Sequence, residues 1–150
     1  MNKDYRQLLE GCDEDGAYEF PVEFDYDALE RDALIVEREL QNQLDLRTKF
    51  EGTVFNQDAS FSIAIILLDY TQKRGNIIYQ PTIRFSNFGR LCTLTFAEMI
   101  PADISGEILA VLEAGGFHYI PQGVLDTDYD GVMAGNKALP TWWIRYFDWL

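Results

Sequence analysis

SFSIAIILL, residues 60–68, lies near the start of the stretch that decides the fold, residues 59–96. Its side chains form a near-continuous apolar run, and several are β-branched, which predicts a strand covered on both faces. Residues 77–86 and 91–96 alternate apolar with polar side chains, the pattern of half-buried strands. We therefore expect three consecutive strands, with residues 60–68 in the interior of the sheet.

The connections between these strands are short. Residues 73–76 (KRGN) and 87–90 (NFGR) both contain Gly and Asn, which tolerate the positive φ of a tight turn. Such turns join antiparallel neighbours, so the pattern predicts a β-meander. Residues 46–56 are expected to add a strand before it. Pro81 predicts an open edge or a bulge in the third strand, because proline has no N–H to donate.

Two longer segments have the 3.6-residue period of amphipathic helices. In residues 27–45 the apolar stripe consists of Leu29, Ala33, Val36, Leu40 and Leu44, and Asp25 or Asp27 can cap the N-terminus. In residues 103–114 the stripe consists of Ile104, Ile108, Val111 and Leu112. The 150 residues therefore predict a single globular α+β domain, an antiparallel meander of about four to six strands with two main helices packed on it.

The remaining segments are less regular. Residues 2–12 predict a short helix, and residues 117–120 a short strand. Residues 18–24 alternate apolar with acidic side chains and are expected to form an edge strand or an extended arm. Residues 123–140 predict a loop. Residues 141–150 contain all three tryptophans and are apolar on every side, so they fit either a strand or a helix and must be largely covered.

Acidity dominates the composition. The chain has 25 Asp and Glu against 12 Lys and Arg, a net charge of −13, and residues 1–32 contain eleven of these acids but only three bases. A field of this sign repels nucleic acid and anionic membranes and attracts basic proteins. A simple contribution to solubility is the alternative explanation of the charge. We expect a basic protein as the partner, and neither nucleic acid nor a membrane.

The N-terminus and the cysteines indicate a cytosolic protein. Residues 1–4 lead into a charged segment without the apolar core of a signal peptide, and the apolar run at residues 63–68 is too short to cross a bilayer. Cys12 lies among acids, which raise the pKa of a thiol, and Cys92 lies in an apolar strand. We therefore expect two free thiols. With a single histidine, a Cys₂His₂ zinc site cannot form.

Residues 126–131 (DTDYDG) match the first half of a calcium-binding EF-hand loop. Acids at alternate positions can converge on one cation, and the glycine permits the sharp turn between them. The match ends there, because Lys137 stands where the loop requires a bidentate glutamate and neither flank has the pattern of an EF-hand helix. We interpret the segment as a solvated acidic turn or part of a partner surface, without a bound metal.

Motifs for catalysis are missing from the sequence. His118 is the only histidine, and no G-x-S-x-G nucleophile motif accompanies it. There is no P-loop and no G-x-G-x-x-G after a strand. Pairs of carboxylates are expected by chance in so acidic a chain. We therefore expect no enzymatic activity, no catalytic residue and no cofactor.

Three stretches resemble small acidic bacterial immunity proteins, which neutralise polymorphic or contact-dependent toxins. They are residues 83–89 (IRFSNFG), 119–121 (YIP) and 142–148 (WWIRYFD). The resemblance implies a cytosolic inhibitor that binds a toxin domain tightly and masks its active site. Immunity proteins have many unrelated folds, so no functional residue is carried over from the resemblance.

An acidic inhibitor suits a nuclease-type toxin, because many nuclease toxins are basic and opposite charge accelerates association. We expect two clusters to contact such a partner: Asp13, Glu14 and Asp15, and Asp126, Asp128 and Asp130. The alternative is a secretion or assembly chaperone that holds a client protein. A chaperone is expected to have apolar grooves and to dimerise, whereas an inhibitor needs a folded basic partner. The sequence leaves the oligomeric state open.

Overall fold

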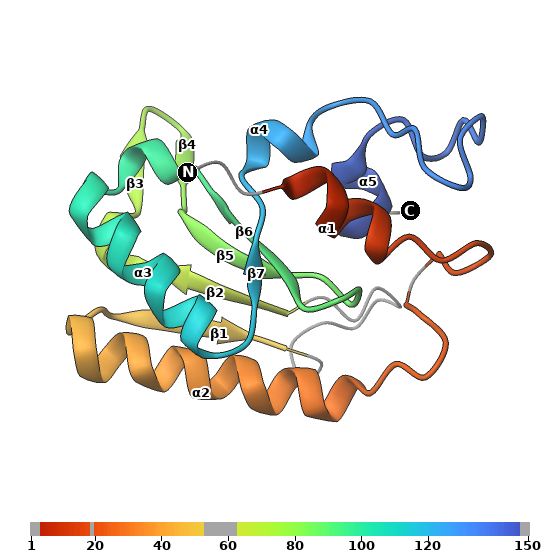
Figure 1. Cartoon of the computed structure of the whole chain (residues 1–150). Coiled ribbons are helices and arrows are strands. Elements are labelled where there is room, and N and C mark those ends of the chain that lie inside the picture. The colour runs from red at the N-terminus through yellow and green to blue at the C-terminus, as the bar shows by residue number, and fades with distance from the viewer. Residues whose placement is uncertain (1–3, 19, 53–62, 148–150) are drawn as a thin grey trace.

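A five-stranded sheet forms the centre of the fold (Figure 1). The computed structural model describes residues 4–18, 20–52 and 63–147. In spatial order the strands are β1 (Thr48–Glu51), β2 (Ile63–Leu67), β5 (Thr82–Phe85), β6 (Leu91–Thr95) and β7 (His118–Tyr119). The first four are antiparallel neighbours, whereas β7 pairs in parallel with β6. The α+β class is confirmed.

β2 is the inner strand that its apolar run predicts. It lies between β1 and β5, and all five of its residues are buried. The antiparallel turn at residues 87–90 is also present, since it joins β5 to β6. Of the strand expected at residues 46–56, β1 is observed, and residues 53–56 lie outside the described residues.

One part of the meander prediction is wrong. Residues 77–86 do not form one strand but two, β4 (Ile77–Tyr79) and β5, which are separated at Pro81. β4 pairs with β3 (Gln72–Arg74) in a separate two-stranded sheet, so the turn at residues 73–76 closes this hairpin instead of joining two strands of the main sheet. Proline has no N–H for a ladder, and its carbonyl accepts a hydrogen bond from the Leu67 N–H at 2.9 Å.

Helices α2 (Tyr26–Leu44) and α3 (Ala102–Ala114) cover one face of the sheet (Figure 1). The Asp25 carboxylate caps α2 by accepting a hydrogen bond from the Ala28 N–H at 3.1 Å. The buried residues of α2 are Leu29, Ala33, Val36 and Leu40, and those of α3 are Ile108, Val111 and Leu112. Both predicted stripes therefore face the sheet and form, with its side chains, a core that we call the helix-layer core.

A second core lies toward the other end of the molecule. It is formed around α1 (Tyr5–Gly11), α4 (Gln122–Leu125) and α5 (Trp142–Phe147). α5 resolves the alternatives for the C-terminal segment in favour of a helix, and Trp142, Tyr146 and Phe147 are buried as its apolar composition requires. α4 begins one residue before the segment predicted as a loop, and its last three residues lie within that segment. The 3₁₀-helices are η1 (Leu68–Tyr70) and η2 (Ala97–Met99).

Residues 18–24 contain no strand in the part that the structure describes. The chain turns at Val22 and Glu23, and Glu23 has a φ of 65°. The Phe20 and Phe24 rings stack at 5.7 Å between centroids. This segment is therefore a folded-back arm, not an edge strand. None of the helices in the described ranges is long and apolar enough to cross a membrane.

Candidate partner-binding surface

Two acidic segments that are far apart in the sequence meet at one end of the molecule. The Asp13 carboxylate accepts hydrogen bonds from the Val132 N–H at 2.9 Å, 119 positions away, and from the Tyr129 hydroxyl at 2.9 Å. We call the surface formed by residues 13–18, 20–22 and 126–132 the loop end. It lies on the right of Figure 1, away from the β3–β4 hairpin. The two predicted contact clusters therefore belong to one surface.

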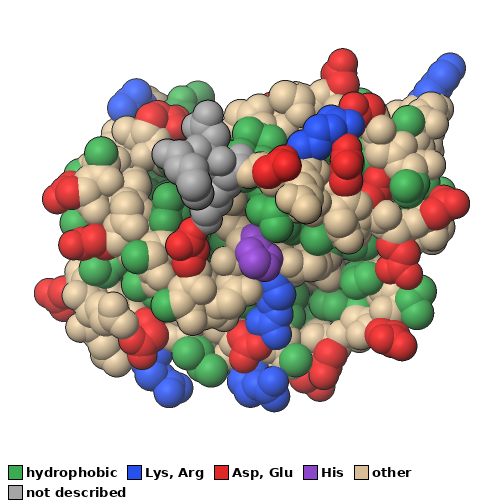
Figure 2. All heavy atoms as spheres, viewed as in Figure 1, with side chains coloured by type: hydrophobic (Ala, Val, Ile, Leu, Met, Phe, Trp, Pro, Cys, Tyr) green, Lys and Arg blue, Asp and Glu red, His purple; other side chains and the backbone are tan. Residues whose placement is uncertain are grey.

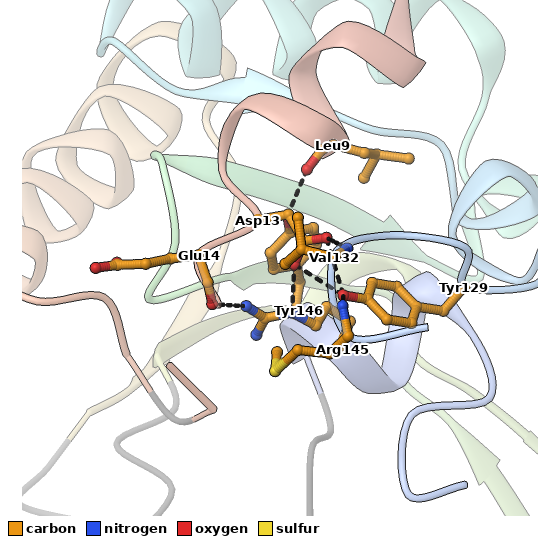
Figure 3. A network of polar contacts seen from close by, with 8 residues as sticks. Leu9, Asp13, Glu14, Tyr129, Val132, Arg145 and Tyr146 are labelled. Atoms are coloured by element: carbon orange, nitrogen blue, oxygen red, sulfur yellow. Dashed lines mark hydrogen bonds and ion pairs between the residues drawn. The ribbon is translucent and has the colours of Figure 1, made fainter. Parts of the chain in front are cut away.

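Asp13 itself faces inward. Its carboxylate forms an ion pair with the Arg145 guanidinium, at 2.9 Å between Nε and Oδ1, and the two side chains are 1% and 0% exposed. Arg145 also donates to the Glu14 carbonyl at 3.1 Å and lies 4.6 Å from the centre of the Phe88 ring. Figure 3 shows how this network ties α5 to both loops. The Asp13 carboxylate is therefore not available to contact a partner.

The EF-hand-like segment takes part in the same network. The Tyr129 hydroxyl accepts a hydrogen bond from the Met133 N–H at 3.0 Å while donating to Asp13. A Cβ atom at Gly131 would lie 1.8 Å from Asp13 Oδ2, so this close approach explains the glycine. Within the described ranges, no group of three or more His, Cys, Asp or Glu residues is arranged to hold a metal ion.

The other predicted acids lie outward. Asp15, Asp126, Asp128 and Asp130 are exposed, whereas Glu14 is half-buried. The Glu14 carboxylate accepts a hydrogen bond from the Val22 N–H at 3.1 Å, which holds the arm against the first loop. Asp130 forms an ion pair with Arg6 at 2.8 Å. Asp15, Asp126 and Asp128 are therefore the acids best placed to meet a partner.

Exposed apolar side chains accompany these acids. Val22 and Val132 are 72% and 60% exposed, and Tyr18 and Phe20 are also exposed. Partner surfaces combine apolar and aromatic anchors with a charged rim in this way. The sequence analysis did not identify these four residues as site residues. For Tyr18, Phe20 and Val22 the alternation of apolar and acidic residues at 18–24 was the available signal, whereas Val132 lies outside that pattern.

The remaining candidate side chains are not assembled into a reactive site. His118 is exposed on β7, near the centre of the face in Figure 2. Both cysteines are free, as predicted, with Cys92 buried in the helix-layer core. Burial, assisted by Asp13, raises the pKa of the Cys12 thiol, so this thiol is a poor nucleophile at neutral pH.

Comparison with known proteins gives no relative for this chain. No family model matches it, and neither a curated protein nor a solved structure matches it.

Proposed function

We propose that the protein is a cytosolic inhibitor that binds a basic, nuclease-type toxin through the loop end and masks the toxin's active site. The observation that carries the proposal is the loop end itself, where exposed acids stand beside exposed apolar side chains on loops held by a buried ion pair. The resemblance to bacterial immunity proteins supports the same function. The protein then acts by binding, without catalysis or a cofactor.

Each component of the loop end has a defined task in this proposal. Asp15, Asp126 and Asp128 attract the basic partner and accelerate encounter, because opposite charges steer association. Val22, Val132, Tyr18 and Phe20 contribute affinity once they are desolvated. The Asp13–Arg145 pair fixes both loops before binding, so less conformational entropy is lost in the complex.

Affinity capture tests the proposal. Tagged wild-type protein is incubated with lysate of the source cells, washed at low and then high salt, and the retained proteins are identified by mass spectrometry. We expect one basic protein in near-equal amount. The loop-end variant, Asp15→Lys/Asp126→Lys/Asp128→Lys, should lose it, because each substitution replaces an attraction by a repulsion.

A second triple variant is the matched control. Asp27→Lys/Glu98→Lys/Asp103→Lys changes the net charge by the same amount at exposed residues outside the loop end. It should retain the partner. Equal loss of the partner from both variants would show that overall charge, and not the loop end, governs binding, and would contradict the proposal.

The second candidate function is that of a secretion or assembly chaperone. The apolar groove between α2 and α3, lined by residues including Ile35, Leu44 and Ala110, favours it. A chaperone would retain unfolded or secreted clients instead of one folded basic protein. The capture experiment separates the two functions by the identity of what is retained and by its sensitivity to the loop-end substitutions.

A further inference from the structure

The β3–β4 hairpin is a basic and apolar projection on an acidic protein. Ile77 and Ile78 are 57% and 60% exposed, and Lys73 and Arg74 are exposed on the partner strand. The sequence contains no acid between Asp69 and Glu98. A two-stranded ribbon has little stability of its own in water, and exposed apolar side chains on it mark a surface of interaction.

The groove between α2 and α3 has the opposite character. It has a volume of about 590 Å³, is open to solvent, and is lined by apolar side chains that include Ile35, Leu44 and Ala110. Its charged lining residues are Glu39 and Glu107, and neither Lys nor Arg is among the described residues that line it. Acidic side chains are also visible over α3 at the left of Figure 2. The groove therefore suits an apolar segment that carries positive charge.

We infer that the chain forms a two-fold dimer in which the β3–β4 hairpin of each copy occupies the α2–α3 groove of the other. The hairpin enters the groove tip first, with Arg74 and Ile77 on one face of the ribbon and Lys73 and Ile78 on the other. Each face meets one wall of the groove, so Ile77 and Ile78 contact its apolar lining while Lys73 and Arg74 approach Glu39 and Glu107. The charges of hairpin and groove are complementary, and each surface leaves apolar area exposed in the single chain. Both complementary surfaces therefore belong to the same chain, so two copies can bind each other.

The hairpin and the α2–α3 groove both lie away from the loop end. The hairpin lies beside the approach to α3, since the Tyr79 and Phe96 rings are 5.5 Å apart and Phe96 directly precedes η2. The hairpin, α3 and the C-terminal end of α2 lie at the left of Figure 1. In the proposed dimer a two-fold axis makes both contacts at once, and reciprocal contacts end the assembly at two copies. The loop end, at the other end, stays free, so the dimer does not depend on the proposed function.

A charge swap tests the dimer. The hairpin variant is Lys73→Glu/Arg74→Glu and the groove variant is Glu39→Lys/Glu107→Lys. Each variant alone places like charges at both contacts and should raise the dissociation constant by about tenfold or more. Their equimolar mixture restores opposite charges at both contacts. Sedimentation equilibrium should give twice the 17.3 kDa of one chain for the wild type and for the mixture, and the mass of one chain for each variant alone.

Two controls accompany the swap. Arg31→Glu/Lys137→Glu changes the net charge as the hairpin variant does, at exposed residues outside both surfaces, and should remain a dimer. Zero-length carbodiimide crosslinking of mixed ¹⁴N and ¹⁵N wild-type chains requires no variant to fold, and should yield an intermolecular link from Lys73 to Glu39 or Glu107. A monomeric wild type, a mixture that stays monomeric, or a control that dissociates equally overturns the inference.

Discussion

The two cores of this protein are built on different principles. The helix-layer core is built from apolar side chains of two amphipathic helices and the sheet. The core beneath the loop end surrounds the buried Asp13–Arg145 pair and is rich in aromatic rings. The first core depends on shape and apolar area, and the second depends on exact pairing of polar atoms. Their responses to substitution should differ accordingly, and the following predictions are arranged by decreasing effect.

Removal of Arg145 should have the largest effect. Arg145→Met leaves the Asp13 carboxylate buried without its cation, which should lower the free energy of unfolding by about 3–5 kcal/mol. Urea denaturation followed by circular dichroism measures the loss. In the double variant Asp13→Leu/Arg145→Met the lone charge is gone, so its loss should be smaller than that of Arg145→Met. A double variant that is less stable than the single one would contradict this explanation.

In the helix-layer core the corresponding change is Leu40→Ala. Leu40 is fully buried on α2, and the cavity left by its side chain should cost about 3 kcal/mol. Urea denaturation again measures it. Combined with Arg145→Met the losses should add within about 0.5 kcal/mol, because distant sites without shared partners are independent. Strong non-additivity would mean that the two cores do not behave as separate units.

The next largest loss of stability is expected at Gly131, where the backbone packs closely against Asp13. In Gly131→Ala the new methyl group would lie against Asp13 Oδ2, which the network holds in place, so we expect a loss of about 2 kcal/mol in thermal or urea unfolding. Gly123→Ala is the matched control, because no atom lies near its added Cβ. Equal effects of the two substitutions would argue against a constrained carboxylate.

Alkaline pH should weaken the core beneath the loop end. Burial, followed by the nearby Asp13 charge, raises the pKa of the Tyr146 phenol above its ordinary value of 10.0. Above pH 10 the unfolded chain releases this proton while the folded chain keeps it, so stability is complete below pH 10 and declines as the pH rises. Tyr146→Phe should lower stability by about 1 kcal/mol at neutral pH, through the lost hydrogen bond to the Leu9 carbonyl.

Comparison of the wild type with Tyr146→Phe separates the titration of the Tyr146 phenol from that of other groups. Urea denaturation of both proteins from pH 9 to 11 should show a decline for the wild type that is steeper than that of Tyr146→Phe by about 1.4 kcal/mol per pH unit above pH 10. Other groups that titrate in this range are common to both proteins and cancel in the difference. Parallel curves would contradict the raised pKa of Tyr146.

The smallest loss of stability is expected at a surface ion pair, which also joins an arginine to an aspartate. Arg47 and Asp69 are 2.7 Å apart, but the Arg47 side chain is largely exposed. Arg47→Met should therefore cost less than about 1 kcal/mol. The hydrogen bonds from the Arg47 backbone and side chain lower the pKa of Asp69, so this contribution is present at neutral pH and disappears as the pH falls through the carboxyl range. A loss comparable to that of Arg145→Met would remove the distinction between buried and exposed pairs.

The difference between the cores also explains what could be predicted from the sequence. α2 has a regular period of apolar residues, and both of its ends were predicted to within one residue. The continuous apolar run of β2 predicted its end to within one residue, whereas residues 60–62 lie outside the described residues. α5 is buried on most sides and therefore has no amphipathic stripe, so its sequence could not distinguish helix from strand. Asp13 and Arg145 are 132 positions apart, and no local pattern connects them. An acid that looks like part of a charged surface can thus be the centre of a core.

The sequence predicted the acidic residues of the loop end but not its exposed apolar residues. Asp15, Asp126 and Asp128 are exposed as a contact surface requires. Val132 is exposed because the chain bends around Asp13, and that geometry depends on a contact between distant segments. Apolar side chains on loops become recognisable as a surface only after the loops are folded together.

The decisive measurement compares stability and partner retention in one protein, Asp15→Lys/Asp126→Lys/Asp128→Lys. These side chains are exposed and lie outside the buried network, so the variant should unfold at nearly the wild-type urea midpoint. It should nevertheless fail to retain the basic partner that the wild type captures. Retention of that partner at the wild-type level by a folded variant would contradict a loop end that binds it.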